Sequence, residues 1–197
     1  MHIINTLEFA PYDYAKENHK SPIYDDTDED WYIYWKRCMH DSGLSYLEPI
    51  QKRSWLVNID TISNTDFRIL AEVKKSDKDL GEELEKEFYG GIVIIPENEE
   101  IKLTTSCCGG DLSNLEEWEN IFTDTNQKWQ MLWIGHPYPY YRHNEDYIEF
   151  SEQMEGDVDE NTKVNLTVSK IWLEKEIKKL RLKQDKFIKQ IEELLNS

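Results

Sequence analysis

The strongest constraint on the fold lies in the last part of the chain, where apolar residues recur at spacings of three and four. This interval matches the turn of an α-helix, about 3.6 residues, so the pattern predicts one long amphipathic helix over about residues 169–195. Such a seam packs either on the chain's own sheet or on the same helix of a second copy, and both interpretations stay open at this point. The seam, with one polar position, consists of Leu173, Ile177, Leu180, Gln184, Phe187, Ile191 and Leu194.

The rest of the chain alternates short β-branched or aromatic segments with short helical patterns. The β-like segments begin with His2–Phe9 and end with Val164–Val168. The pattern predicts one α+β domain over residues 1–197, with a mainly antiparallel sheet of about six to eight strands, helices on one face and the C-terminal helix packed across it. Three segments close in sequence should pair as a meander. These segments are Trp129–Ile134, Tyr138–Arg142 and Tyr147–Phe150.

Short polar sequences predict where two helices begin and where one ends. Thr27 precedes three acidic residues, which is typical of an N-cap followed by a first turn that suits the positive end of the helix dipole. Gly43 is a candidate C-terminal cap for the same helix. Ser113 and Glu116 have the spacing of a capping box, so we expect a second helix to begin with Ser113 as its cap.

Composition argues against several classes of function. The 23 basic and 40 acidic residues give a net charge of −17, which repels phosphate backbones, so we expect no nucleic-acid partner. The apolar runs are far shorter than the ~18 residues of a membrane span, so we expect no membrane partner. The N-terminus lacks a signal-like pattern, and three cysteines do not suggest a disulfide framework. Together these features favour a cytoplasmic protein with reduced thiols.

Charge is distributed unevenly along the chain. Residues 161–197 hold 9 basic and 5 acidic residues, a net charge of +4, whereas residues 1–160 hold 14 basic and 35 acidic residues, a net charge of −21. Within the second group, Glu145–Glu160 carries 8 carboxylates and no lysine or arginine. This segment is either a solvated loop or an acidic face that attracts a basic protein partner. The contacts expected for such a face are Glu145, Asp146, Glu149, Glu152, Glu155, Tyr140, Tyr141 and Tyr147.

Cys107-Cys108 is the most unusual dipeptide for chemistry. Zinc sites usually place two cysteines two to four residues apart, so an adjacent pair favours two structural thiols at a strand end. A nucleophilic cysteine would need a base, for which His136 and His143 are candidates. No established nucleotide-binding, hydrolase or metalloprotease motif occurs. We therefore expect no enzyme activity, no cofactor and no metal; the alternative is a cysteine- or metal-dependent hydrolase that uses Cys107 or Cys108 with His136.

A dense aromatic stretch follows at residues 133–141. Gly135 and two prolines favour a bend between strands, and His136 is restricted to extended backbone because it precedes Pro137. Trp133 is either buried or part of an exposed aromatic patch that faces a partner, since Trp and Tyr often anchor protein interfaces. The sequence leaves both interpretations open.

The same region carries a family resemblance. In order, Thr104–Leu112, Trp118 and Leu132–Pro137 resemble the CCGDL…W…LWIGHP signature of a little-characterised group of small bacterial proteins, with one extra glycine in the turn. The resemblance itself implies no particular activity. The signature residues matched in this chain are Cys107, Cys108, Gly109, Asp111, Trp118, Trp133, Gly135, His136 and Pro137.

In its general style, the small acidic α+β chain also resembles immunity proteins of bacterial toxin systems, including the SUKH class, which bind and neutralise toxins. This resemblance implies protein binding rather than catalysis. Together with the acidic segment, it leads us to expect a non-enzymatic inhibitor of a basic bacterial toxin, either monomeric or homodimeric. A homodimeric scaffold joined through the C-terminal helix is a further alternative.

Overall fold

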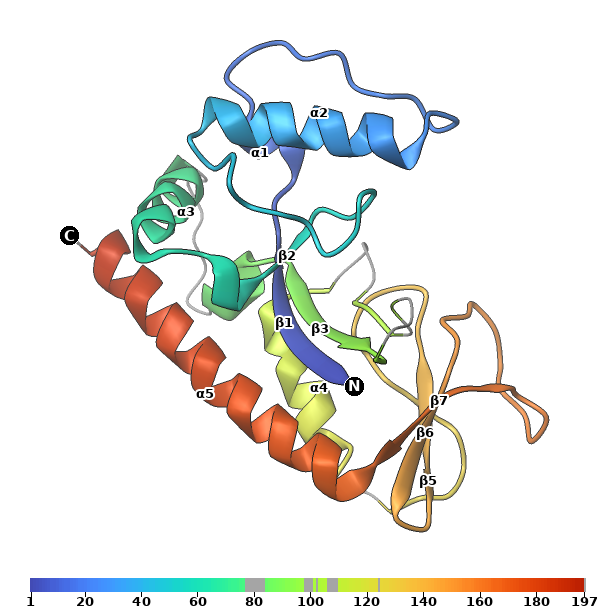
Figure 1. The fold of residues 1–197 in the computed structure, drawn as a ribbon. Coiled ribbons are helices and arrows are strands. Elements are labelled where there is room, and N and C mark those ends of the chain that lie inside the picture. Colours follow the sequence, from blue (N-terminus) through green and yellow to red (C-terminus); the bar gives the residue numbers. More distant parts are fainter. Residues whose placement is uncertain (77–83, 98–100, 102, 106–109, 124, 197) are drawn as a thin grey trace. The chain divides into compact units, whose positions relative to one another are not determined.

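The computed structural model describes residues 1–76, 84–97, 101, 103–105, 110–123 and 125–196 (Figure 1). Cys107, Cys108 and Gly109 of the signature lie outside these residues. The chain divides into two compact units, of which the first holds residues 1–5 and 88–187 and the second holds residues 6–87 and 188–197. The single domain expected for the whole chain stays a prediction. The first strand and the last helix each contribute residues to both units.

A four-stranded antiparallel sheet forms the centre of the first unit. Its strands follow the order β4-β5-β6-β7, and the register places Phe150 opposite both Tyr141 and Leu166. The predicted meander is confirmed, because the three segments pair in sequence order. The strands are β4 (Gln130–Met131), β5 (Tyr140–Asn144), β6 (Tyr147–Ser151) and β7 (Val164–Ser169).

Two helices supply apolar residues to the same core. The ring of Trp118 in α4 (Leu115–Asn120) lies 5.7 Å from the ring of Phe150 in the sheet. Helix α5 (Lys170–Leu195) confirms the predicted C-terminal helix, and its apolar seam packs within this chain. A coiled coil with a second copy would use the same seam, and the homodimeric scaffold stays a prediction. The seam residues in this core are Leu173, Ile177 and Leu180.

Further elements complete the first unit. β3 (Gly90–Ile95) is the neighbour of β1 (His2–Glu8), whose first residues belong to this unit. The 3-10 helix η3 (Leu112–Asn114) leads into α4, and its N-cap is Asp111, whose carboxylate accepts from the N–H of Ser113 at 2.8 Å. The prediction that Ser113 caps this helix is therefore wrong, because the ionised side chain two residues earlier satisfies the first free N–H group.

In the second unit, the later residues of β1 pair antiparallel with β2 (Leu56–Asn58), and Leu7 lies opposite Val57. Helix α2 (Asp28–Asp41) contributes the fully buried Trp35. The indole N–H of Trp35 donates to a backbone carbonyl of the segment after β1 at 2.8 Å, so this buried donor is satisfied. The remaining elements of this unit are α1 (Pro11–Tyr14), η1 (Ile59–Thr61), α3 (Asn64–Ser76) and η2 (Leu84–Glu87).

Both ends of α2 follow the sequence prediction. The hydroxyl oxygen of Thr27 accepts from the N–H of Asp30 at 3.2 Å, and the carboxylate of Asp30 accepts from the N–H of Thr27 at 3.1 Å. At the other end, Gly43 has a φ of 78°, a left-handed backbone that ends a helix at little cost for glycine. The local chemistry of these residues is sufficient to set the bounds of α2.

The predicted α+β class, with antiparallel sheets and a long C-terminal helix, is confirmed. The prediction of a single sheet is wrong, since the strands in the described part of the chain form one sheet of three and one of four. Leu103 makes an isolated antiparallel bridge to Ile94 of β3. No helix in the described ranges is both long enough and apolar enough to cross a membrane.

Candidate functional site

One short segment of the first unit alternates between core and surface. Leu132 and Ile134 are buried, whereas Trp133 is 55% exposed. The hydroxyl of Thr105 donates to the carbonyl oxygen of Ile134 at 3.0 Å. This buried hydrogen bond attaches the backbone of the segment to the interior of the unit. Gly91 allows this approach, because a Cβ there would lie 3.3 Å from the side chain of Thr105. The packing on either side therefore directs Trp133 outward, and the buried interpretation of this residue is wrong.

Trp133 belongs to a small exposed group of aromatic side chains beside a carboxylate. Its ring lies 4.8 Å from the ring of Tyr138 in an edge-to-face arrangement, and the ring of His136 lies 5.1 Å from Tyr138. Nδ1 of His136 is 3.9 Å from Oε1 of Glu155, and both side chains are well exposed. We call these four residues the Trp133 surface.

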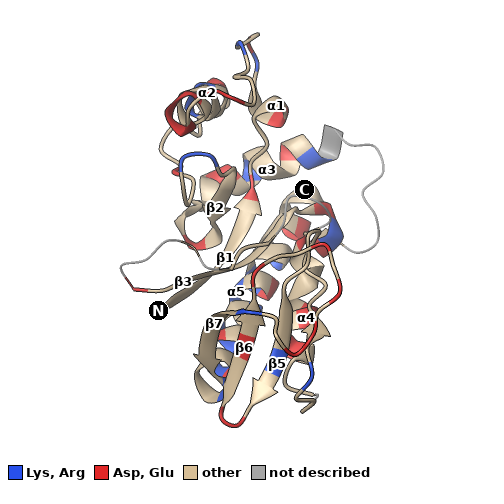
Figure 2. Cartoon of the chain, turned by 90° about the vertical axis from the view of Figure 1, so that its right-hand side faces the viewer, with Lys and Arg blue, Asp and Glu red and all other residues tan. Residues whose placement is uncertain are grey.

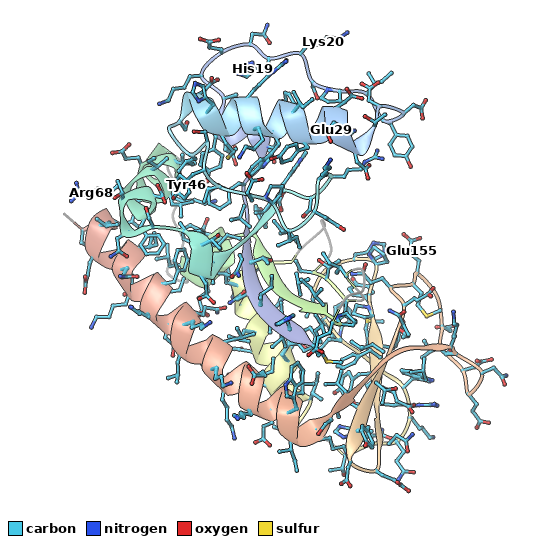
Figure 3. All side chains as sticks on the ribbon, viewed as in Figure 1. His19, Lys20, Glu29, Tyr46, Arg68 and Glu155 are labelled. Carbon is cyan, nitrogen blue, oxygen red and sulfur yellow. The ribbon has the colours of Figure 1, made fainter. Side chains whose placement is uncertain are left out.

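Backbone pairing determines where Glu155 lies. Met154 and Tyr138 exchange two backbone hydrogen bonds, of 3.0 and 3.3 Å. On the other side of Glu155 in sequence, the carbonyl of Gly156 accepts from the hydroxyl of Tyr140 at 3.0 Å. The loop is bonded on both sides of Glu155, so its backbone is held in this position; Figure 3 labels the residue.

The predicted acidic contacts that are exposed lie in two groups, one at each end of β6. Glu145 and Asp146 lie in the turn between β5 and β6, as Figure 2 shows, and Tyr147, at the start of β6, is 50% exposed beside them. Glu152 and Glu155 lie in the loop after β6. The 5 residues of β6 separate the two groups. At about 3.3 Å per residue, this separation is ~17 Å.

Three predicted contacts are buried. Glu149, Tyr140 and Tyr141 are 9%, 8% and 6% exposed. The carboxylate of Glu149 accepts from Nε of Arg142 and from Nδ2 of Asn144, each at 2.7 Å. Burial raises the pKa of Glu149, but the hydrogen bonds from Asn144 and Arg142 outweigh burial and hold its pKa below its usual range. Since buried and paired side chains cannot meet a partner, these three residues do not belong to a contact surface.

The described signature residues divide into a buried set and an exposed set. Trp118 is part of the core and is 1% exposed. Gly135 has a φ of 109°, a backbone conformation that favours glycine, and the peptide bond between His136 and Pro137 is cis. Trp133 and His136 are the exposed members. The signature therefore combines residues that build the first unit with two residues that this packing presents to solvent.

The alternative hydrolase requires a cysteine and a base. Cys107 and Cys108 lie outside the described residues, so that alternative stays a prediction. His143 is buried, and its Nε2 lies 3.0 Å from a backbone carbonyl oxygen, whereas His136 lies on the Trp133 surface. In the second unit, Cys38 is buried, and burial raises the pKa of its thiol, which disfavours the nucleophilic thiolate.

One group of side chains in the second unit could approach a cation. Ligand atoms of Glu17, His19 and Asp41 lie within 4.8 Å of one another. Oδ2 of Asp41 already accepts from the N–H groups of Lys16 and Glu17 at 2.9 and 3.0 Å, and it lies 2.8 Å from Nε2 of His19. Burial raises the pKa of Asp41, but these bonds together hold its pKa below its usual range. These bonds join the segment at residues 16–19 to the C-terminal end of α2, which accounts for the group without a cation.

The chain matches no protein-family model, no curated protein and no solved structure. The comparisons therefore bear neither on the CCGDL…W…LWIGHP resemblance nor on the resemblance to immunity proteins. A function for this chain has to be argued from the geometry and charge of its own residues.

Proposed function

We propose that the protein is a cytoplasmic, non-enzymatic binding protein that captures a basic protein partner on the Trp133 surface, in the manner of an immunity-type inhibitor of a bacterial toxin. The observation that carries the proposal is the exposed Trp133, packed against Tyr138 next to the carboxylate of Glu155. Trp and Tyr dominate the energetics of many interfaces, because they bury large areas while few rotatable bonds become ordered.

Charge gives this surface a preferred kind of partner. Glu155 is exposed beside the aromatic group, and Glu152, three residues earlier in the same loop, is exposed with its carboxylate 3.8 Å from Nζ of Lys163. The sequence holds no lysine or arginine from residue 145 to residue 160. A lysine or arginine of the partner can pair with these carboxylates and lie against the ring of Trp133, since cations are attracted to aromatic faces. A nuclease toxin presents basic residues where it binds nucleic acid, and an acidic inhibitor can cover that site.

The same charge makes the association dependent on salt. Attraction between an acidic and a basic surface raises the association rate, toward ~10⁸ M⁻¹s⁻¹ at low salt. The Debye length falls from ~10 Å at 0.1 M salt to ~3 Å at 1 M salt, so the attraction weakens as salt is added. Packing around Trp133 is apolar and is expected to be less sensitive to salt.

Affinity capture from the source organism, followed by mass spectrometry, tests the proposal. Two matched pairs of variants locate the site, because each pair removes the same kind of group at the Trp133 surface and at the β5–β6 turn. We expect the first variant of each pair to lose a basic partner that the wild type and the second variant retain. The pairs are Trp133→Ala with Tyr147→Ala, and Glu152→Gln/Glu155→Gln with Glu145→Gln/Asp146→Asn.

The possible outcomes separate the parts of the proposal. Equal capture by all variants would exclude the Trp133 surface as the binding site. Loss of the partner only with the turn variants would place the site at the other end of β6. Capture of a partner whose binding does not weaken between low and high salt would contradict the electrostatic argument.

A further inference from the structure

The first unit contains a pocket of about 830 Å³. Small-molecule sites usually have volumes of ~300–1,000 Å³. Strand alternation places this pocket on the face of the four-stranded sheet opposite the apolar core, since Arg142 lines the pocket and its neighbour Tyr141 belongs to the core. The charged and apolar side chains around the pocket are those of Lys128, Trp129, Arg142, Val158, Asp159 and Glu160.

Arg142 is fixed in place before any ligand arrives. Its guanidinium carbon lies 4.5 Å from the centroid of the Trp129 ring. Its Nε donates to Glu149 at 2.7 Å, and Glu149 is itself held by Asn144. A guanidinium that is stacked and hydrogen-bonded has little conformational freedom left to lose, so a bound anion would not have to order it.

The pocket presents hydrogen-bond donors that the protein does not use. Over the described ranges, the terminal nitrogens of Arg142 and the ammonium of Lys128 have no hydrogen-bond or ion-pair partner. The indole N–H of Trp129 is shielded from solvent and likewise has no partner among the described residues. Arginine and lysine donors on one pocket favour an oxygen anion, and two free guanidinium N–H groups match the geometry of a carboxylate.

Two carboxylates also line the pocket, and they come from a different segment than Lys128 and Arg142. Asp159 and Glu160 lie in the loop after β6, and within the described residues neither of them forms an ion pair with Lys128 or Arg142. Lys128 and these two carboxylates therefore do not neutralise each other directly, whereas the charge of Arg142 is offset by Glu149. A purely anionic ligand would be repelled by the carboxylates and by the net charge of −17. A purely cationic ligand would leave the free N–H groups of Arg142 and Lys128 without a partner.

We propose that this pocket binds a small zwitterion with an amine and a carboxylate, either a free amino acid or a dipeptide. The ligand carboxylate lies at Arg142 and Lys128, and its ammonium lies at Asp159 and Glu160. The exposed parts of Trp129 and Val158 suit an apolar side chain. This site is separate from the Trp133 surface, so the proposal does not depend on the function proposed above.

Titration with L-phenylalanine and with glycyl-L-phenylalanine tests the proposal. Isothermal calorimetry gives the affinity, and the ¹H–¹⁵N spectrum follows the indole N–H of Trp129, which Trp129→Phe assigns. We expect saturable binding of at least one zwitterion at concentrations up to about 10 mM, with a shift of the Trp129 signal. Binding of only one probe identifies the free amino acid or the peptide as the source of the zwitterion. N-acetyl-L-phenylalanine and L-phenylalanine amide should each bind at least about tenfold more weakly, because each lacks one charge.

Variants of exposed residues keep the test independent of folding. Lys128→Gln and Glu160→Gln should each weaken binding at least about threefold, because each removes one charge from the pocket. Lys175→Gln and Glu116→Gln remove the same charges elsewhere and should leave the affinity unchanged. Arg142→Gln is unsuitable alone, since it would leave Glu149 buried without its cation. Absence of saturable binding by both zwitterions, or equal binding of the N-acetyl and amide probes, would overturn the proposal.

Discussion

The side-chain amide of Asn5 donates to Oε1 of Gln184 at 2.7 Å, although 179 residues separate the two in sequence. Gln184 in turn donates to the carbonyl oxygen of Leu112 at 2.8 Å. Both side chains are buried. The polar side chain of Gln184, in the apolar seam of α5, therefore has hydrogen-bond partners in β1 and in η3. This pair defines the position of α5 along the core of the first unit, because a shift of the helix would leave buried amides without partners.

Replacement of Gln184 by leucine should destabilise the protein, although leucine suits an apolar seam. The substitution leaves the side-chain N–H of Asn5 buried and without its partner, which costs about 1–3 kcal/mol, whereas the carbonyl of Leu112 keeps its bond from the N–H of Leu115. Urea unfolding measures the change in the free energy of unfolding. Gln190→Leu, at a partly exposed position of the same helix, should change it by less than about 0.5 kcal/mol. A Gln184→Leu protein as stable as the wild type would show that the network contributes nothing.

Glu149 should make stability depend on pH in the acid range. Its pKa in the folded state lies below the ordinary value of 4.5, because bonds from Asn144 and Arg142 outweigh the effect of burial. A carboxyl with a lowered pKa contributes stability above its unfolded-state pKa, and this contribution is lost as pH falls through the folded-state pKa. We expect Glu149→Gln to be less stable than the wild type at pH 7, with the difference shrinking below about pH 4. Urea unfolding at several pH values measures this difference in the free energy of unfolding. Glu116→Gln, at an exposed position, is the control.

Gly91 should not tolerate a side chain. Its φ of 136° is unfavourable for other residues, and an added Cβ would lie 3.3 Å from Thr105, whose hydroxyl holds the Trp133 segment. Gly91→Ala should lower the free energy of unfolding by more than ~1 kcal/mol. Gly156→Ala is the matched control, since nothing lies within 4 Å of a Cβ there. Thermal unfolding of both variants tests this prediction. Equal unfolding midpoints for Gly91→Ala and Gly156→Ala would contradict the packing argument.

Two tryptophans of the signature should respond differently to truncation. Trp118 is 1% exposed and Trp133 is 55% exposed. Trp118→Ala should cost about 3–5 kcal/mol of stability because it opens a cavity in the core. Trp133→Ala should change stability by less than about 1 kcal/mol, since most of the ring is in water. Chemical unfolding measures both; a large loss with Trp133→Ala would mean that the residue has a structural role.

The sequence predicted parts of the candidate site but not their arrangement. Glu155 and Trp133 were recognised from composition and from the signature. Their proximity depends on the backbone pairing of Met154 with Tyr138, which no local pattern reveals. The burial of Glu149 was missed because it follows from a cross-strand ion pair with Arg142. Side chains alternate along a strand, and this alternation could have indicated that Glu149 points to the face of the sheet opposite its apolar neighbour Ile148.

The sequence by itself determined the elements whose causes are local. The spacing of apolar residues is sufficient for α5, and Thr27 and Gly43 are sufficient for the ends of α2, because helix periodicity and capping act within a few residues. Only the tertiary structure decided which side chains of a short segment meet solvent. Trp133 is exposed because residues distant in sequence, Gly91 and Thr105, pack behind its neighbour. Exposure depends on such distant partners, which no local pattern of residues reveals.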